Sequence, residues 1–579
     1  MEKEKVDYSI YLVTDSTEAI LGSRDLIQVV EQAVYGGGFG SVLRSLCFWP
    51  NNTDMDQSIT IVQYRDKTSD TGVLISTAKR LHELCKKHGI PLIINDRVDV
   101  ALAVGCEGVH LGQDDMSVTE ARRILGDSKI IGATVSSILE AHMAVAQGAD
   151  YLGIGTLYAT NTKKNTKDII GITGIRKILR YLDDGTEAER KIKTVCIGGI
   201  NASNVQRITH QLLAPTPAKS FPKTIDGVAV VSAIIGSPDA RFASTVFCQS
   251  FHNPPPFTAQ STGPHFWHEN ESEEISSIVH KAVQCTKAVK TKTPLSHNMT
   301  NLVVQNFAAN VALAIGASPI MANYGLEAPD LAQLKGGLVI NMGTVTPDGL
   351  LNFKQAINAY NAAGGPIVLD PVGAGATSIR REALTTLMSE GYFDLIKGNE
   401  KEIMAVARTS GLEIYTSYWS GQQQQRGVDA GSQLLTLDQR AALVLHLAAR
   451  ERNIVLMTGA TDLISDGTRT YAISNGHAYL GLITGSGCTL GTTLSAYLAA
   501  NPEDKLMAAV AGLLHFEIAA ERAARRDSKV KGPGTFVPEF IDELWSFGEG
   551  VVNGEEGLLA TEVKVECIKH FADAKVVEI

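Results

Sequence analysis

The chain has 579 residues, a formal net charge of −10 and a pI near 5.8. This length exceeds a single ordinary domain of about 100 to 200 residues, so at least two domains are expected. Lys and Arg are scattered through an acidic chain, which argues against a nucleic-acid surface and indicates small-molecule partners.

The beginning of the chain, MEKEKVDYSIYLVTD, has no apolar signal stretch. No run approaches the roughly 18 apolar residues that a membrane-spanning helix needs, so we expect no membrane partner and a cytoplasmic protein. The eight cysteines lie far apart without a CxxC pair. Their spacing indicates neither a structural zinc site nor a disulfide framework.

Short β-branched runs recur between helical patterns in the first 240 residues. There are eight: IYLVT (10–14), ITIVQ (59–63), PLIIN (91–95), GVHL (108–111), KIIGA (129–133), DYLGI (150–154), KTVCI (193–197) and DGVAV (226–230). This number of strands over this length predicts a (β/α)8 TIM barrel, which we assign to residues 1–240. Polar inserts near 38–57, 182–192 and 211–224 are expected to be loops.

The second barrel strand ends in three polar residues at alternate positions, Gln63, Arg65 and Lys67. Side chains at every second strand position share a face, so this basic cluster indicates a bound anion. Because barrel active sites lie at the C-terminal strand ends, we expect the cluster at the mouth.

Carboxylates follow the next two strands. Asp96 comes after Asn95 at the end of the third strand, and Asp115 lies in HLGQDD after the fourth. Carboxylates together with substrate phosphate oxygens are the usual ligands of Mg²⁺ in proteins. The sequence therefore predicts a Mg²⁺ and diphosphate site.

A second phosphate position is indicated at strands seven and eight. These strands end in IGGIN (197–201) and VSAI (231–234), where Gly198, Gly199 and Ser232 are candidate ligands. Barrels often bind phosphate at these two loops because glycine lets backbone N–H groups approach the anion. After strand six, GTLYATNTKK adds Thr160, Thr162 and Lys163, which lie between the two positions.

In order, the QxRxK strand, the Asn-Asp pair, HLGQxD, the TxTK loop, the GGI turn and VSAI resemble thiamine-phosphate synthase over nearly the whole first half. The resemblance implies that Gln63, Arg65, Lys67 and Asn95 bind hydroxymethylpyrimidine diphosphate, with Mg²⁺ on Asp96 and Asp115. It places Lys163 on the diphosphate, and Thr134 where the family often has Ser. Thiazole phosphate would contact Thr160, Thr162, Gly198, Gly199, Val231 and Ser232.

The expected chemistry follows from charge. Diphosphate leaves the pyrimidine's benzylic-type carbon while Mg²⁺, Arg65, Lys67 and Lys163 take up negative charge, and the thiazole nitrogen attacks that carbon. This reaction requires no protein nucleophile.

The stretch FHNPPPFTAQSTGPHFWH (251–268) has no hydrophobic period, and we expect a linker over residues 241–270. Beyond it, over 271–579, strand candidates again alternate with helical patterns: SPIMA (318–322), GLVIN (337–341), PIVLD (366–370), DLIKG (394–398) and NIVLMTG (453–459). Nearly continuous apolar runs favour a parallel sheet covered on both faces, hence a doubly wound α/β domain. The QQQQ at 422–425 is expected to be a surface loop.

The stretch ITGSGCTLGTTLSAYLAA is a glycine-rich turn that leads into a helix. Such a turn presents free N–H groups to phosphate. Cys488 lies at the helix start, where its pKa is expected to be lowered and its side chain can face a substrate hydroxyl.

Together with SHNMTN, LVINMGT, VLDPVGAGAT, IKGNEKEI and MTGATDLISDG, this turn resembles hydroxyethylthiazole kinase of the ribokinase-like superfamily. The resemblance implies that Met321 and Gly485 contact the thiazole alcohol, that Arg380 and Thr458 contact ATP, and that Asn399 and Glu402 organise Mg²⁺. Cys488 takes the place of a catalytic Asp, as a hypothetical general base. Lys397 replaces a common Arg, and His297 is expected to be structural.

The sequence thus predicts a bifunctional enzyme whose kinase half makes the phosphate that the barrel uses, as in the fungal fusion. A rival hypothesis is a phosphate-binding isomerase or aldolase fused to an unrelated kinase. Another is a catalytically inactive thiamine-pathway sensor. Such a sensor is expected to have lost its carboxylates or its glycine loop, whereas Asp96, Asp115 and the GSGC turn are intact. The kinase resemblance further implies a homo-oligomer built on a trimer.

Overall fold

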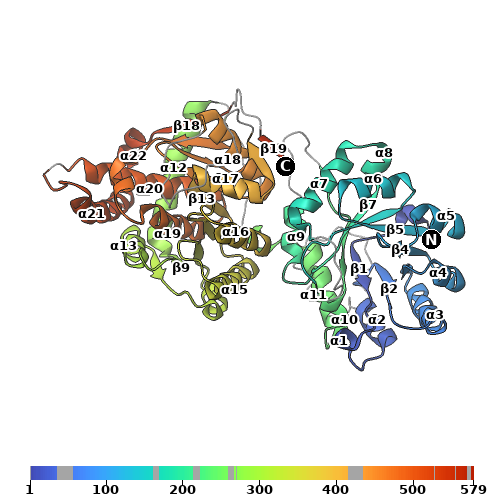
Figure 1. Cartoon of the computed structure of the whole chain (residues 1–579). Coiled ribbons are helices and arrows are strands. Elements are labelled where there is room, and N and C mark those ends of the chain that lie inside the picture. Colours follow the sequence, from blue (N-terminus) through green and yellow to red (C-terminus); the bar gives the residue numbers. More distant parts are fainter. Residues whose placement is uncertain are drawn as a thin grey trace. The chain divides into compact units, whose positions relative to one another are not determined.

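The computed structural model describes residues 2–35, 57–160, 169–212, 222–258, 267–268, 270–414, 435–526, 528–554, 556–569 and 576–578. The described part of the chain forms two compact units (Figure 1). The boundary between them lies between Pro254 and Pro255. Among the described helices, none has the length and apolar character needed to cross a membrane.

The first unit is built on a closed barrel of eight parallel strands in chain order. The strands are β1 (Ile10–Val13), β2 (Ile61–Tyr64), β3 (Leu92–Asn95), β4 (Gly108–Leu111), β5 (Ile130–Val135), β6 (Tyr151–Ile154), β7 (Lys193–Cys196) and β8 (Gly227–Val230). The barrel closes because β1 pairs with both β2 and β8. The predicted TIM barrel is confirmed, and each strand overlaps its expected run.

Helices surround the barrel strands (Figure 1). They are α1 (Glu18–Leu21), α2 (Leu26–Val34), α3 (Thr71–Lys87), α4 (Val98–Val104), α5 (Val118–Leu125), α6 (Ile138–Ala146), α7 (Gly171–Asp184), α8 (Glu187–Lys191), α9 (Val205–Leu212), α10 (Ser232–Ile235) and α11 (Ala240–His252), with a 3₁₀ turn, η1 (Lys3–Lys5). The stretch at 182–192, expected to be a loop, instead contains α8. Its start is fixed by a capping box between Thr186 and Glu189.

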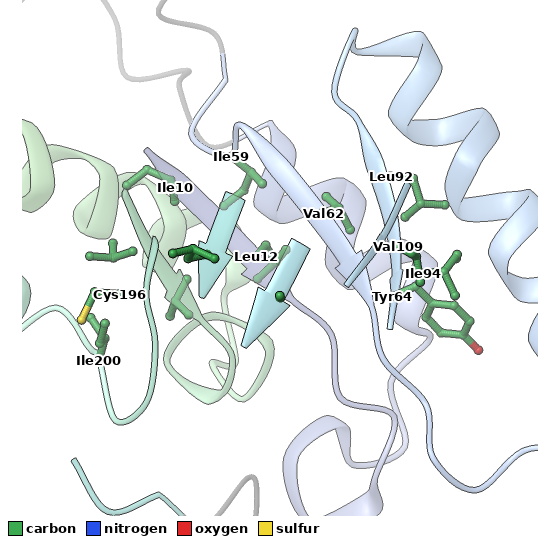
Figure 2. Close-up of a cluster of buried hydrophobic side chains, with 14 of the residues drawn as sticks. Ile10, Leu12, Ile59, Val62, Tyr64, Leu92, Ile94, Val109, Cys196 and Ile200 are labelled. Carbon is green, nitrogen blue, oxygen red and sulfur yellow. The ribbon is translucent and has the colours of Figure 1, made fainter. Parts of the chain in front are cut away.

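Strand alternation divides the barrel residues into two apolar layers. On β1, Ile10 and Leu12 face outward and pack beneath the helices, in the layer shown in Figure 2. Tyr11 and Val13 belong to the inner cluster, which also contains Tyr151 of β6. This period-two pattern directs every second side chain into the barrel.

The structure differs from the expected linker at 241–270. Helix α11 occupies 240–252 and belongs to the first unit, with Phe247 buried in the outer core of the barrel. Residues Pro256–Thr258 form a 3₁₀ turn, η2, in the second unit. Because α11 has an apolar face, its helical period outweighs the prolines that follow it.

The second unit contains a nine-stranded sheet in the order β10-β9-β11-β12-β13-β15-β16-β17-β18. The strands are β9 (Leu295–Met299), β10 (Ser318–Ile320), β11 (Gly337–Asn341), β12 (Ile367–Asp370), β13 (Leu395–Asn399), β15 (Ile454–Thr458), β16 (Asp462–Ser465), β17 (Thr470–Ile473) and β18 (Val565–Cys567). The six strands from β10 to β15 are parallel, whereas β16, β17 and β18 are antiparallel. The sheet is therefore mixed, with an edge that the sequence did not predict.

Helices cover both faces of this sheet. They are α12 (Glu271–Lys292), α13 (Gln305–Ile315), α14 (Ala328–Gln333), α15 (Pro347–Ala363), α16 (Ser378–Glu390), α17 (Glu400–Thr409), α18 (Leu437–Glu451), α19 (Ser486–Ala500), α20 (Lys505–Ala524), α21 (Pro533–Val552) and α22 (Glu556–Glu562), with turns η3 (Gly325–Glu327) and η4 (Ala478–Leu482). The apolar cluster with α12, α13 and α19 to α21 is separate from that with α14 to α18. The doubly wound fold is confirmed. A small antiparallel pair, β14 (Leu412–Ile414) and β19 (Val576–Glu578), lies apart from the sheet.

Candidate active sites

The C-terminal ends of the barrel strands enclose a cavity of about 490 Å³. Twelve expected site residues line it: Gln63, Arg65, Lys67, Asn95, Asp96, Asp115, Thr134, Thr160, Gly198, Gly199, Val231 and Ser232. The other two, Thr162 and Lys163, lie outside the described residues. The alternating cluster at the end of β2 and the ends of six further strands therefore meet in one place.

Two side-chain contacts fix the ends of β2 and β3. Gln63 Nε2 donates to Asn95 Oδ1 at 2.7 Å, which leaves the Gln63 oxygen and the Asn95 amide N–H groups for a ligand. Arg65 donates from one guanidinium nitrogen to Asp15 Oδ2 at 3.1 Å. Asp15 is 2% exposed, and its other oxygen accepts from the Thr17 backbone and hydroxyl. The sequence reading missed Asp15.

The carboxylate pair also faces the cavity. Lys67 donates to Asp96, and Gly112 N donates to Asp115 Oδ2 at 2.7 Å. Burial and the neighbouring Asp96 carboxyl raise the pKa of Asp115. A carboxyl group whose charge is disfavoured by a neighbouring carboxylate suits a divalent cation. Within the described ranges, no group of three or more His, Cys, Asp or Glu could hold a metal, so these two would need oxygens from substrate or water.

The loop after β7 requires its glycines. Gly198 and Gly199 have φ of 101° and 70°, in the left-handed region. A Cβ on Gly198 would lie 2.4 Å from the side chain of Thr156, and one on Gly199 would lie 2.7 Å from the Cβ of Tyr158. At the neighbouring strand, Ser232 begins α10 just after β8. These two loops give the cavity a rim of backbone N–H groups.

The floor of the cavity is polar. Tyr11, His110 and Tyr151 line it together with Thr134, and these four side chains are joined by hydrogen bonds. The first three residues were not predicted as site residues, although His110 lies in HLGQDD. They could have been identified from strand alternation, because all three occupy strand positions whose side chains face the inside of the barrel.

In the second unit, the glycine-rich turn leads into α19 as expected. Gly485 caps the helix with φ of 85°, and Cys488 is its third residue. Asn301 Nδ2 lies 3.7 Å from Cys488 Sγ. Burial raises the pKa of Cys488 to about 11, with Asp370 contributing in the same direction. The expected lowering of this pKa is therefore wrong, because burial opposes the thiolate.

A buried ion pair lies behind the turn. Lys397 Nζ is 3.0 Å from Asp370 Oδ2, and Asn341 Nδ2 donates to the same oxygen at 2.9 Å. A Cβ on Gly487 would lie 3.9 Å from Lys397 Nζ, so this ammonium is next to the glycine turn. Asp370 was not predicted as a site residue, and Lys397 was noted only for replacing an Arg.

The Asn399 and Glu402 pair forms the capping box of α17. Glu402 accepts from Gly373 N at 2.8 Å and from Asn399 N at 2.9 Å. Burial, with Asp370 as the next cause, raises the pKa of Glu402 from 4.5 to about 7. Local geometry thus explains this pair without a metal, and burial disfavours the charged form of the Glu402 carboxylate.

The remaining expected kinase residues lie near strand ends. Met321 follows β10, and Thr458 ends β15. Arg380 on α16 donates to the backbone carbonyls of Met342, Val372 and Gly343 at 2.6 to 2.9 Å. His297 is buried, and its ring nitrogens bond to Tyr360 Oη and to the Ala322 carbonyl, in agreement with a structural role.

Two family models match the chain, namely thiamine monophosphate synthase over residues 10–234 and the hydroxyethylthiazole kinase family over residues 286–549. A probable thiamine biosynthetic bifunctional enzyme of Schizosaccharomyces pombe is 40% identical over 557 residues, covering 95% of this chain and 97% of the relative. The thiamine biosynthetic bifunctional enzyme of Saccharomyces cerevisiae is 34% identical over 570 residues, covering 94% and 96%.

Solved structures match each half. A hydroxyethylthiazole kinase from Pyrococcus horikoshii is 34% identical and covers 50% of this chain and 99% of its own, with a TM-score of 0.42. A thiamine phosphate pyrophosphorylase from Pyrococcus furiosus is 30% identical and covers 42% of this chain and 96% of its own, with a TM-score of 0.32.

Proposed function

The chain belongs to the family of bifunctional thiamine biosynthetic enzymes, and from this premise we propose which of its residues perform each reaction. The second domain phosphorylates 5-(2-hydroxyethyl)-4-methylthiazole with ATP. The first couples the thiazole phosphate to 4-amino-2-methyl-5-hydroxymethylpyrimidine diphosphate, giving thiamine phosphate and diphosphate. The observation that carries the proposed barrel site is the meeting of basic and acidic side chains in one 490 Å³ cavity.

We assign the pyrimidine diphosphate to the β2 and β3 side of this cavity. The free Gln63 oxygen and Asn95 N–H groups offer an acceptor beside a donor, the complement of an aminopyrimidine edge. Arg65 and Lys67 bind the diphosphate oxygens and stabilise the charge that develops as the C–O bond breaks. Lys163, from the loop after β6, joins them in this proposal.

Asp96 and Asp115 would hold Mg²⁺. The ion supplies positive charge to the leaving diphosphate when it is bound. The raised pKa of Asp115 beside Asp96 supports this assignment, because a cation relieves the repulsion between the two carboxylates.

The thiazole phosphate occupies the opposite rim. Backbone N–H groups of the Gly198–Gly199 turn and the Ser232 hydroxyl bind its phosphate, with Val231 against the thiazole ring. Thr160 and Thr162 complete this side. The arrangement places the thiazole nitrogen opposite the pyrimidine carbon, which favours reaction through orientation.

In the kinase, the thiazole alcohol lies between Met321 and the Gly485 turn. Its oxygen attacks the terminal phosphorus of ATP, the bond to ADP breaks, and the hydroxyl proton is released to solvent. The N–H groups at the start of α19 and the Lys397 ammonium stabilise the transferred phosphoryl group. Cys488 lines the hydroxyl side. Its raised pKa supports a neutral thiol, so we assign it to positioning the alcohol and withdraw the base role.

ATP extends toward Thr458, with Asn399 and Glu402 beside its Mg²⁺. Arg380 already donates to three backbone carbonyls, so its main role is to hold the loops at 342–343 and 372, where we place the nucleotide. Its remaining N–H groups would contact ATP. Lys397 is the better placed cation, since it lies next to the glycine turn.

We further propose a homo-oligomer built on a kinase trimer. Asn301 contacts Cys488, and the next two residues, Leu302 and Val303, are 77% and 75% exposed. Leu482, which precedes the glycine turn, is 64% exposed. A groove of about 420 Å³ adjoins them between α13, residues 483–484 and α21. Apolar side chains this exposed around a substrate site favour cover by a second copy. Light scattering of the purified chain tests the trimer.

The seven cysteines in the described part of the chain are all free thiols, which supports a reducing compartment and hence a cytoplasmic location. The overall proposal is tested by incubating the chain with hydroxyethylthiazole, ATP, Mg²⁺ and pyrimidine diphosphate, omitting each in turn. Thiamine phosphate, detected by mass spectrometry, should require all four. If supplied thiazole phosphate is coupled but the thiazole alcohol is not, the kinase domain is inactive. If neither is coupled, the result favours an inactive sensor.

A further inference from the structure

A glutamine at the mouth of the barrel joins two neighbouring loops. Gln113 follows β4 in HLGQDD, and it does not line the cavity, whereas Gly112 and Asp115 of the same loop do. Its Nε2 lies 2.9 Å from each carboxylate oxygen of Glu140 and 3.0 Å from Ser136 Oγ. Ser136 follows β5, and Glu140 lies in the first turn of α6. Because β4 and β5 are paired, this side chain connects the loops of adjacent strands.

The acceptor of this contact is fixed by its own loop. Ser136 N donates to Glu140 Oε2 at 2.6 Å, and Ser136 Oγ lies 3.0 Å from the same oxygen. Ser137 caps α6 by accepting from Glu140 N. Burial opposes the charge on Glu140, but the hydrogen bonds that it accepts, from Ser136 and Gln113 among others, together favour it, so its pKa is lowered. Gln113 therefore donates to a charged group, which makes a stronger hydrogen bond than a neutral acceptor would.

The turn that contains Gln113 also carries Asp115. Gly112 N donates to Asp115 Oδ2 at 2.7 Å, and Asp115 N donates to the Gly112 carbonyl at 3.3 Å. A Cβ on Gly112 would lie 2.8 Å from Asp115 Oδ2, so a larger residue would move the carboxylate. Gln113 lies inside this closed turn. Its contact with Glu140 therefore ties the turn, and with it the Asp115 carboxylate, to the β5 side of the mouth.

We propose that Gln113 is a positioning residue for the coupling reaction: by donating to Glu140, it holds the 112–115 turn so that the Asp115 carboxylate faces the metal position. The inference rests on the proposed placement of Mg²⁺ on Asp96 and Asp115. Groups that orient a metal-binding side chain change the affinity for the metal without contacting it. Gln113 thus supplies neither a ligand nor a charge, and its effect passes through Asp115.

The first test compares Gln113→Leu with the unmodified full chain. Mn²⁺ is the probe, and its binding in the presence of inorganic diphosphate is measured from the electron paramagnetic resonance signal of the free ion. Asp115→Asn gives the background binding of the rest of the protein. Gln113→Leu should weaken Mn²⁺ binding at the Asp115 site about tenfold. In the coupling reaction the Mg²⁺ half-saturation should rise by a similar factor, whereas kcat at saturating Mg²⁺ should fall by less than about threefold.

The second test removes the partner of Gln113. Glu140→Ala should weaken Mn²⁺ binding at least as much as Gln113→Leu does, because it takes away the acceptor that anchors the turn. In the Glu140→Ala background, Gln113→Leu should change the Mn²⁺ affinity by less than about twofold, as expected for two residues of one contact.

Two controls separate this role from general damage to the barrel. Gln57→Leu is the matched variant, since Gln57 Nε2 donates to the His88 carbonyl at 2.7 Å and the residue lies before β2 rather than at a strand's C-terminal end. It should leave Mn²⁺ binding and coupling unchanged. Kinase turnover of each variant checks the second domain. Should Gln113→Leu fail to fold, Gln113→Asn serves, because it keeps the amide but is one methylene too short to reach Glu140.

Unchanged Mn²⁺ affinity in Gln113→Leu or in Gln113→Asn would overturn the inference, as would an equal effect of Gln113→Leu with and without the Glu140 carboxylate. A lower kcat with unchanged metal affinity would also overturn it, because general disturbance of the barrel acts in that way. If Asp115→Asn binds Mn²⁺ as tightly as the unmodified chain, the proposed metal position falls and the inference falls with it. Failure of the coupling activity itself would instead appear as missing thiamine phosphate from the unmodified chain.

Discussion

Lys397 and Asp370 form an ion pair of 3.0 Å in which the two side chains are 4% and 1% exposed. Burial opposes the charge on Lys397, but Asp370, Cys488 and Glu402 together favour it, so the pKa of Lys397 is raised. The Lys397 ammonium therefore stays charged although it is almost completely shielded from water. It also lies beside the glycine turn that we assign to the transferred phosphate.

Replacing Lys397 by Met should therefore abolish most kinase turnover, by about 100-fold or more, because it removes a cation from the phosphate site. It should also destabilise the second domain by about 3 kcal/mol, since Asp370 is left buried without its partner. Thermal denaturation and kinase rates check both effects. Lys397→Arg should restore much of each. Lys354→Met, which breaks the half-exposed pair with Glu390, should cost about 1 kcal/mol or less and is the matched control.

Cys488→Ser should retain kinase turnover to within about tenfold. The reason is that a thiol with a pKa of about 11 is almost fully protonated at neutral pH and cannot act as a standing base. The pH profile of kcat should show no limb that disappears in Cys488→Ser between pH 6 and pH 9. Complete loss of turnover in a folded Cys488→Ser protein would reinstate the base assignment.

Much of the fold could be read from hydrophobic runs. The barrel strands and five of the parallel strands in the second unit lie where β-branched residues cluster. Strand β9 was missed because its sequence, LSHNM, is polar, and its Ser296, His297 and Asn298 are buried through hydrogen bonds. Strands β16 and β17 pair antiparallel through a short turn, and β17 pairs with β18, which lies about 90 residues later in the chain. No local hydrophobic period reveals the second pairing.

The site residues divide in the same way. Gln63, Arg65 and Lys67 were predictable from their alternate spacing and all three line the cavity, although β2 ends at Tyr64 and only Gln63 belongs to the strand. Asp15 was not, since its partner Arg65 lies 50 residues away and only barrel closure brings the two together. The same holds for the Tyr151 contact of His110, across 41 residues. Burial determined the protonation state of Cys488, and burial cannot be read from a helix start.

Asp15→Asn should weaken the coupling reaction through Arg65. The buried carboxylate holds the guanidinium at 3.1 Å, and the amide keeps its size but loses its charge. We expect the KM for pyrimidine diphosphate to rise about tenfold with a smaller change in kcat, because the main loss is of ground-state binding. Thiazole phosphate KM and kinase turnover serve as controls. An unchanged pyrimidine KM would show that Asp15 does not position Arg65.

Asp115→Asn should weaken Mg²⁺ binding at the mouth of the barrel. Because burial and Asp96 raise the pKa of Asp115, its charge costs stability at neutral pH, and a cation offsets that cost. The variant without Mg²⁺ should be at least as stable as the unmodified protein, whereas the stabilisation by Mg²⁺ should be lost. The coupling half-saturation for Mg²⁺ should rise at least about tenfold. Asp114→Asn, one residue earlier and outside the cavity lining, is the matched control.

Glu402 should make the kinase sensitive to pH near neutrality. Its pKa rises from 4.5 to about 7, so between these values the folded state binds more protons than the unfolded state. Stability contributed by this group therefore falls as pH rises from 4.5 through 7, and Mg²⁺ binding gains over the same range as the carboxylate ionises. The Mg²⁺ half-saturation of the kinase should be several-fold higher at pH 6 than at pH 8. If Glu402→Gln keeps that ratio, another group titrates; if the ratio is absent in the unmodified protein, the carboxylate does not act on the metal.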